Sequence, residues 1–189
     1  MVSSEILSGV GGYLAPFSGS VYGEIVEIPD FLSVDEMTRI ADKVSTESLD
    51  SDVYPNTHIW KNTDYDHAFD KIRYLWDNWS LVSSNDSPNT IREALQASPA
   101  HMRDYPMHTD HGGKALTILV PISPFQSTPT RFHGAQGKHP IQTIPWRINH
   151  AYMFVPDSQL TYHSYIGGND DRYVLNINFL YDTIAPLNK

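Results

Sequence analysis

Along the chain, the spacing of hydrophobic residues changes from a helical to a strand-like pattern near residue 100. From Met102 onward, short β-prone segments are separated by Gly, Pro and Asn, a composition typical of strands joined by turns. Strands are expected at residues 102–110, 114–122, 128–133, 141–144, 147–155, 160–165 and 172–181. Many short strands that follow helices predict a double-sheet barrel.

Two amphipathic helices are predicted before these strands. Ser33 and Glu36 have the spacing of a capping box, and an apolar stripe at helical spacing follows: Val34, Met37, Ile40, Ala41 and Val44. A second helix is expected from Asp64 to about Trp79, with its stripe at Tyr65, Phe69, Ile72, Trp76 and Trp79. We interpret both stripes as core.

The other N-terminal segments are less regular. Residues 1–20 are rich in Gly and Ser and are expected to form an arm or a loop, and residues 21–28 alternate like a strand. Residues 53–60 fit either a strand or a loop over a pocket. In that segment Trp60 is a candidate for substrate contact, with ordinary packing as the alternative.

Composition bounds the domain count and the class of protein. A chain of 189 residues with 40% hydrophobic and 12% aromatic residues suits a single domain at 1–189, with a β core at about 100–182. A net charge of −9 argues against general binding to nucleic acid or to anionic membranes. The absence of cysteine excludes disulfides, cysteine-ligated zinc and thiol nucleophiles.

The N-terminal residues lack the basic and apolar regions of a signal peptide. No segment approaches the roughly 18 apolar residues needed to cross a bilayer. We therefore expect a cytoplasmic protein.

The strongest chemical signal is the order of His108, Asp110 and His163. In an extended strand, side chains two residues apart point to the same face, so His108 and Asp110 can reach one ion. His163 lies in a short β-prone run and completes a set of two histidines and one carboxylate. Such a set is typical of non-haem Fe(II), where it leaves open positions on the metal. The H-x-D pair alone also fits an ordinary surface pair, and His111 is the nearest competing ligand.

Arg172 adds an anion-binding group to this set. It follows a dense turn signal at residues 166–171 and begins a strand-like run, so a hairpin would place it beside the strand of His163. A guanidinium is a planar, permanently charged fork that suits a carboxylate. Arg172 is therefore a candidate anchor for an acidic cosubstrate. The alternative is a salt bridge with Asp170 or Asp171.

These residues resemble the H-x-D…H…R signature of the iron(II)- and 2-oxoglutarate-dependent dioxygenases, in particular the prolyl-4-hydroxylase-like branch. The resemblance extends from about Tyr105 to Tyr181, and more loosely to residues 28–33. It implies a mainly β fold with N-terminal helices, namely a double-stranded β-helix (jelly roll) with helices bracing one sheet. It also implies Fe(II) as cofactor, with 2-oxoglutarate and O2 as cosubstrates.

The resemblance assigns roles to particular residues. The catalytic metal ligands are His108, Asp110 and His163, and Arg172 holds the distal carboxylate of 2-oxoglutarate. Further candidates for contact with the cosubstrate are Tyr105, Thr117 and Asn176. Strand alternation also puts Asn176 and Asn178 on the face of Arg172. Candidates for substrate contact are Arg131, His133 and Trp60.

The implied reaction is hydroxylation of an unactivated C–H bond, with release of succinate and CO2. The substrate is a prolyl or other peptide side chain, or an amino-acid-like small molecule. Asp110 argues against the halogenating relatives, which carry a small residue in place of that carboxylate. The alternative is a metal-binding jelly roll of cupin type without oxygenase activity, acting as a binding module or as a lyase or isomerase. Arg172 discriminates between the two, because only the oxygenase needs an acid anchor beside the metal.

Overall fold

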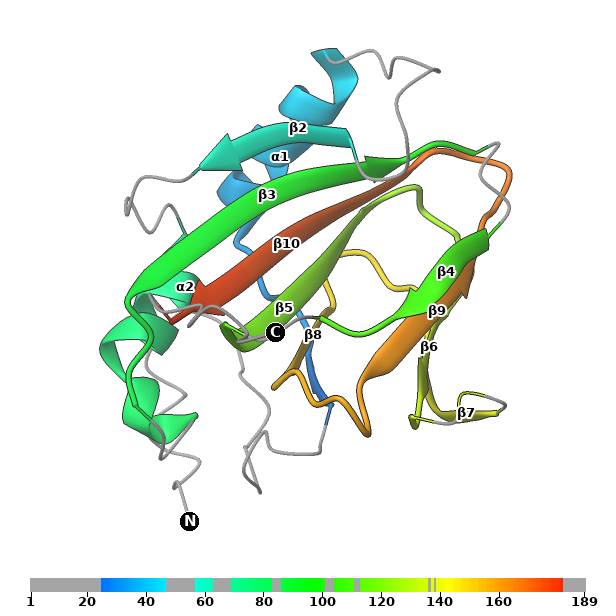
Figure 1. Cartoon of the computed structure of the whole chain (residues 1–189). Coiled ribbons are helices and arrows are strands. Elements are labelled where there is room, and N and C mark those ends of the chain that lie inside the picture. Colours follow the sequence, from blue (N-terminus) through cyan, green and yellow to red (C-terminus); the bar gives the residue numbers. More distant parts are fainter. Residues whose placement is uncertain are drawn as a thin grey trace.

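The described residues form two antiparallel β-sheets with two helices packed on the larger one (Figure 1). The computed structural model describes residues 25–46, 57–62, 69–82, 86–100, 104–110, 113–135, 137 and 139–181. In spatial order, the larger sheet contains β1 (Val26–Ile28), β8 (Ala151–Phe154), β5 (Lys114–Ser123), β10 (Arg172–Leu180), β3 (Thr90–Ser98) and β2 (Thr57–Asn62). The smaller sheet contains β4 (Asp104–His108), β9 (Tyr162–Ile166), β6 (Thr130–His133) and β7 (Pro140–Ile144).

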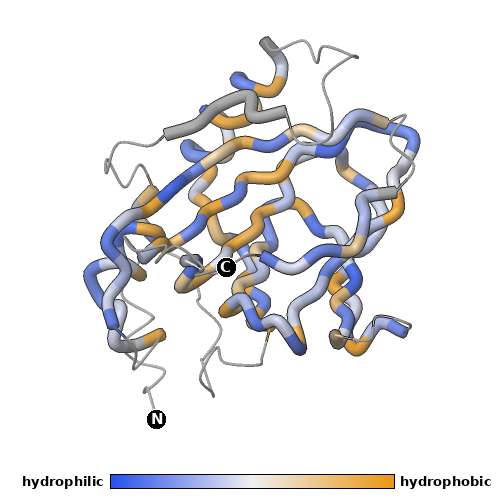
Figure 2. The backbone as a smooth tube through the Cα atoms, in the orientation of Figure 1, coloured by the Kyte–Doolittle hydropathy of each residue, from blue (hydrophilic) through white to orange (hydrophobic). Residues whose placement is uncertain are grey.

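Strand β10 shows how the sequence separates the two faces of the larger sheet. Its odd-numbered side chains are apolar and join the core shared with the helices: Tyr173, Leu175, Ile177 and Phe179. Its even-numbered side chains include Arg172, Asn176 and Asn178, and they face the smaller sheet. Figure 2 shows this alternation as changes of colour along the strand. One strand therefore stabilises the helical layer and supplies polar groups to the space between the sheets.

Helix α1 (Val34–Thr46) begins at the predicted capping box. The backbone N–H of Ser33 donates to Glu36 Oε2 at 2.7 Å, and the backbone N–H of Glu36 donates to Ser33 Oγ at 3.3 Å. The buried stripe is narrower than predicted. Ile40 is buried, whereas Val34 is 82% exposed and Ala41 is exposed. Ala41 lies about 100° around the helix from Ile40, beyond the stripe that meets the sheet.

Helix α2 (Asp70–Asp77) is followed by a 3-10 turn at Trp79–Leu81. It begins later than predicted, and the predicted residues 64–68 lie outside the described residues. Ile72 and Trp79 are buried as predicted, and the Trp79 ring lies 5.6 Å from that of Phe179 in β10. These contacts fix the second helical element against the same sheet face as α1.

The sequence did not predict β3. Its central residues, Arg92 to Gln96, are good helix formers. They are extended here because β3 is hydrogen-bonded on both sides, to β10 and to β2. Three of the six strands of the larger sheet, β1, β2 and β3, therefore precede the expected β core at 100–182.

Other strands are shorter than predicted. Residues 147–150 form a turn instead of the start of a strand, because Asn149 adopts a φ of 56°. Its side-chain amide donates to Leu32 O and accepts from Leu32 N, both at 2.8 Å. The predicted arm at 1–20 and the first half of the strand at 21–28 lie outside the described residues. Across the residues described, the architecture confirms the predicted jelly roll with helices bracing one sheet. No helix among them is long and apolar enough to span a membrane.

Candidate metal centre and its cavity

A cavity of about 350 Å³ lies between the two sheets. Both sheets contribute to its lining, which is formed by Gln96, Ser98, Tyr105, His108, Thr109, Asp110, Lys114, Leu119, Thr130, Tyr152, His163, Tyr165, Arg172, Val174 and Asn176. The cavity combines two cationic side chains and a carboxylate with aromatic and aliphatic walls. This mixture of apolar walls and a few convergent polar groups is typical of a ligand site.

Strand pairing brings the two predicted histidine ligands together. His108 in β4 lies directly opposite His163 in β9, and their ring centroids are 4.2 Å apart. On its other side, His163 pairs with Phe132 of β6, whose ring centroid lies at 5.5 Å. The smaller sheet therefore holds His163 between its partner histidine and a fully buried phenylalanine.

Each imidazole is oriented by a backbone carbonyl two residues earlier. His108 Nδ1 lies 3.1 Å from Pro106 O, and His163 Nδ1 lies 3.0 Å from Thr161 O. Because a carbonyl only accepts a hydrogen bond, Nδ1 must carry the proton in both rings. Nε2 is then the ring atom with a lone pair for a metal.

Asp110 follows β4 and completes the set. Its Oδ1 accepts from Lys114 Nζ at 2.8 Å, and its Oδ2 accepts from Thr117 Oγ1 at 2.7 Å. Burial raises the pKa of Asp110, but Lys114, His163 and Thr117 together outweigh it, so the net pKa lies below its ordinary value. The carboxylate is therefore ionised at neutral pH and suited to a cation.

The three side chains form the one group among the described residues that could hold a metal ion. One potential ligand atom from each of His108, Asp110 and His163 lies within 4.8 Å of the other two. Burial, and next the nearby His108, lower the pKa of His163 to about 4. Its imidazole is neutral at pH 7, which is the protonation state that a metal requires. Two imidazoles and one carboxylate fit a divalent transition metal and leave coordination positions open.

Arg172 lies at the start of β10 in the same cavity and is 4% exposed. Its guanidinium lies over two aromatic rings, with Cζ 4.0 Å from the centroid of Tyr165 and 4.2 Å from that of Trp146. It donates to Thr128 O at 3.1 Å and to Thr130 Oγ1 at 3.0 Å. These contacts fix the plane and the position of the charge.

No carboxylate among the described residues pairs with Arg172, so the predicted alternative of a salt bridge with Asp170 or Asp171 is wrong. Asp171 Oδ1 instead accepts from the backbone N–H of Ala100 at 2.9 Å. The buried Nε of Arg172 has no hydrogen-bond partner in the described part of the chain. Burial lowers the pKa of Arg172, yet a guanidinium remains charged at neutral pH. The site thus presents a cation with an unused donor.

The structure brings Tyr105 and Asn176 to the cavity as predicted. The Tyr105 ring stacks on that of Tyr165 at 5.0 Å, and Asn176 Nδ2 donates to Gln96 Oε1 at 3.1 Å. Thr117 does not line the cavity. It is 1% exposed and contacts Asp110 and Asn178, so it supports a candidate metal ligand, and its contact with the cosubstrate stays a prediction.

The structure does not bring Arg131 and His133 into the cavity. In β6, Thr130 and Phe132 face the interior, so the alternating residues Arg131 and His133 point to the opposite face. His133 Nε2 lies 3.0 Å from Ser164 Oγ on that outer face. Trp60 pairs with Leu95 through β2, and its side chain lies outside the described residues, as does His111.

Several cavity residues were missed by sequence reasoning. Lys114 contacts Asp110, four residues earlier in the sequence, and Tyr152 and Tyr165 line the cavity from strands whose inward-facing residues the sequence pattern did not identify. Tyr152 OH lies 3.0 Å from Thr130 Oγ1, next to the Arg172 guanidinium. The sequence held one usable signal: Tyr165 is two residues after His163 in the same strand, so the two side chains must lie on the same face.

The molecule has two facing sheets, helices on the outer face of one sheet and a His-Asp-His group between the sheets. Its fold is a double-stranded β-helix of the prolyl-4-hydroxylase type. A Pseudomonas putida prolyl-4-hydroxylase structure aligns with a TM-score of 0.56 at 11% identity, covering 84% of this chain and 93% of that one. A Trichoplax adhaerens prolyl hydroxylase, solved in complex with a hypoxia inducible factor oxygen degradation domain peptide fragment, aligns with a TM-score of 0.56 at 14% identity, covering 82% and 83%.

A prolyl 4-hydroxylase from Phytophthora capsici aligns with a TM-score of 0.52 at 15% identity, and the match covers 96% of this chain but 63% of that protein. At these identities the likeness shows the fold. The sequence itself matches no family model and no curated protein.

Proposed function

We propose that this chain is an Fe(II)- and 2-oxoglutarate-dependent dioxygenase that hydroxylates an unactivated C–H bond. The observation that carries the proposal is the presence of the buried Arg172 guanidinium in the same cavity as the His-Asp-His group. The first provides a site for a carboxylate, and the second provides a site for a metal with open positions. A prolyl-hydroxylase type of fold around both groups supports the proposal.

In this proposal, His108, Asp110 and His163 hold the iron. Their preorganisation is visible in the bonds to Pro106 O, Thr161 O and Thr117 Oγ1, because each of these fixes one ligand side chain. When bound, Fe(II) and 2-oxoglutarate supply the oxidising chemistry, in which O2 gives one oxygen atom to succinate and one to the hydroxylated product, with release of CO2.

Arg172 binds the distal carboxylate of 2-oxoglutarate. Leaving a buried donor such as Nε without a partner costs about 1–3 kcal/mol, and a carboxylate would relieve that cost. The hydroxyl groups of Thr130 and Tyr152 lie beside the guanidinium and are suited to share the same anion. Tyr165 and Trp146 keep the cation from rotating, so its direction is set before the cosubstrate binds.

The remaining lining residues exclude water and orient the substrate. Leu119, Val174 and the stacked Tyr105 and Tyr165 rings form apolar walls beside the ligands. Asp110 serves as a metal ligand and not as a proton carrier, in keeping with its lowered pKa. The proposed reaction needs no protein nucleophile and no general base.

The proposed substrates are a prolyl or other peptide side chain, or an amino-acid-like small molecule. One test covers the proposal before the substrate is known. Purified protein is supplied with Fe(II), ascorbate and 2-oxoglutarate, and succinate is measured over time in the absence of substrate. Slow, iron-dependent succinate formation that Asp110→Ala abolishes is expected. No succinate above the level without protein, at any 2-oxoglutarate concentration, would contradict the proposal and favour a metal-binding jelly roll without oxygenase activity.

A further inference from the structure

We infer that Lys114 binds a carboxylate of the substrate, so that the site accepts a small carboxylic acid in preference to a neutral group. This inference rests on the proposed function and names the substrate class of the same site. Four observations carry it: the place of Lys114 in the cavity, the hydrogen bonds available to it, the balance of charge around it, and the volume of the cavity.

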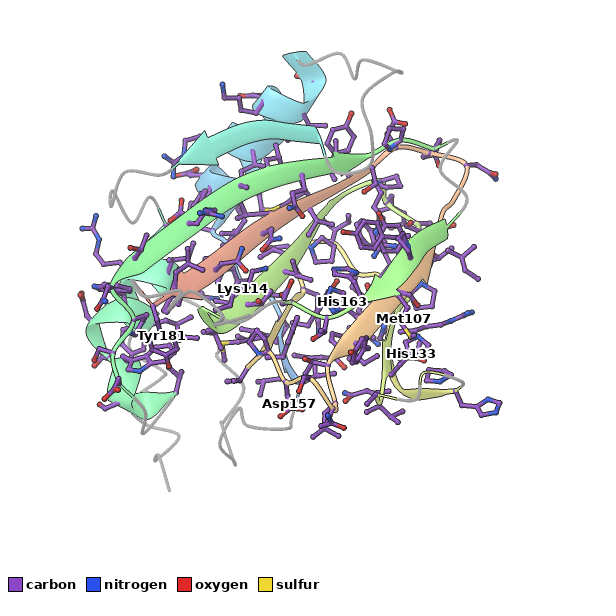
Figure 3. All side chains as sticks on the ribbon, in the orientation of Figure 1. Met107, Lys114, His133, Asp157, His163 and Tyr181 are labelled. Carbon is purple, nitrogen blue, oxygen red and sulfur yellow. The ribbon has the colours of Figure 1, made fainter. Side chains whose placement is uncertain are left out.

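Lys114 is the first residue of β5 and lines the cavity (Figure 3). Its Nζ lies 2.8 Å from Asp110 Oδ1, and its side chain is 23% exposed, against 11% for Asp110. The ammonium therefore lies immediately beside the candidate metal ligands, at a point that solvent and small molecules reach. A group bound there would lie next to the metal, where the reacting bond must be.

The ammonium group of Lys114 has more N–H donors than Asp110 accepts. Both carboxylate oxygens already accept a bond, one from Lys114 and one from Thr117. An ammonium has three N–H donors, and Asp110 is the one partner that the described residues give Lys114. When Asp110 shares its charge with a metal ion, its attraction for Lys114 weakens. Lys114 then has the donors and the charge to hold a second anion.

With Fe(II) and 2-oxoglutarate bound, the charges in the cavity sum to one positive charge. Among the lining residues, Lys114 and Arg172 are cationic, and Asp110 is the only acidic one. Fe(II) carries two positive charges and 2-oxoglutarate carries two negative charges, so these cancel. One positive charge remains, and an uncompensated charge that is partly removed from water is costly. A substrate group with a single negative charge removes this imbalance, whereas a neutral peptide group does not.

The size of the cavity favours a small molecule as the source of that anion. Its volume of about 350 Å³ lies at the low end of the 300–1,000 Å³ range of ligand pockets. It must hold 2-oxoglutarate as well as the reacting part of the substrate. The space that remains suits a compact acid whose carboxylate reaches Lys114 while its C–H bond faces the metal position.

Binding can be measured without turnover when Mn(II) replaces Fe(II). The protein is saturated with Mn(II) and 2-oxoglutarate, so that Arg172 is already occupied, and is titrated calorimetrically with the common L-amino acids and short monocarboxylic acids. Each acid is compared with its primary amide. Dipeptides with a free or an amidated C-terminus test whether a peptide can supply the same carboxylate.

At least one free acid is expected to bind at least about tenfold more tightly than its amide, because a carboxylate both accepts hydrogen bonds from the ammonium and neutralises its charge, whereas an amide only accepts hydrogen bonds. In Lys114→Met the preference should fall to about twofold or less, and in Lys114→Arg it should persist. Thr117→Val is the matched control, because it disturbs Asp110 without removing the cation. It should change the Mn(II) affinity and leave the preference for acid over amide intact.

Three results would overturn the inference: equal binding of acids and amides, no binding by any acid, or an unchanged preference in Lys114→Met. The first titration separates this failure from that of the proposed function. If Mn(II) and 2-oxoglutarate themselves do not bind together, both are wrong. If they bind and no preference for acids appears, the inference about Lys114 alone is wrong.

Discussion

His108 and His163 face each other across β4 and β9, and each donates its Nδ1 proton to the backbone carbonyl two residues earlier in the sequence. The orientation and the tautomer of both imidazoles are thus fixed by the same kind of hydrogen bond. The pairing of β4 with β9 thereby brings two ligands that are 55 residues apart in the sequence to one point.

Removal of a ligand should abolish metal binding without unfolding the protein. We expect His163→Ala and Asp110→Ala to lower the Fe(II) or Mn(II) affinity by at least about 100-fold, because two remaining ligands hold a first-row metal weakly. His139→Ala is the matched control, since His139 lies in the same half of the chain and is exposed. Calorimetric titration checks this prediction. Equal affinities in the control and in the ligand variants would place the metal elsewhere.

Loss of the Thr117 hydroxyl should weaken the metal site indirectly. Thr117→Val keeps the shape of the side chain but removes the bond to Asp110 Oδ2. Partners that orient ligands typically contribute about 10–100-fold in metal affinity, and we expect a decrease in that range. Thr143→Val on the exposed β7 strand should have no effect. If Thr117→Val binds metal as tightly as the parent protein, Asp110 does not depend on this bond.

Arg172 should determine the 2-oxoglutarate requirement. Arg172→Ala removes the charged partner of the distal carboxylate, so the 2-oxoglutarate KM should rise about 10–150-fold. Arg172→Lys should recover part of this loss, because it keeps the charge but not the planar fork. Arg131→Ala is the control, since Arg131 points away from the cavity. Steady-state succinate formation measures all three variants, and an unchanged KM in Arg172→Ala would refute the anchor.

The metal-free protein should lose stability as the pH falls from about 6.5 to 4. The folded protein holds the pKa of His163 at about 4, below its ordinary value of 6.5. Between these values the unfolded chain binds the proton more readily, so folding is most favoured above pH 6.5. The loss from this group should reach roughly 3 kcal/mol at pH 4. Urea unfolding with a chelator present measures the free energy of unfolding at each pH. In His163→Gln this free energy should fall less steeply over the same pH range. Parallel curves for both proteins would contradict the assignment.

The candidate ligands and Arg172 could be predicted because each has a local signature. His108 and Asp110 are two residues apart, at and just after the end of one strand, and Arg172 follows a turn that is evident from its Gly and Asp residues. The capping box at Ser33 was predictable for the same reason. In all three cases, residues close in the sequence fix the local conformation.

Features that depend on distant pairing could not be predicted. The segment at 90–98 contains helix formers and becomes a strand only because β10 and β2 flank it. Arg131 and His133 were assigned to the substrate although their strand turns Phe132 and Thr130 inward. The face of a short strand depends on its register with β9, and a shift by one residue would exchange the two pairs.

Anaerobic titration of the metal-free protein with Fe(II) and then 2-oxoglutarate tests the central proposal most directly. A keto acid that binds iron through two oxygens gives a visible charge-transfer band. We predict that the band appears and saturates, that Asp110→Ala abolishes it, and that Arg172→Ala requires more 2-oxoglutarate to reach it. If iron binds, but no band develops at saturating 2-oxoglutarate, and Arg172→Ala behaves like the parent protein, the dioxygenase proposal is wrong.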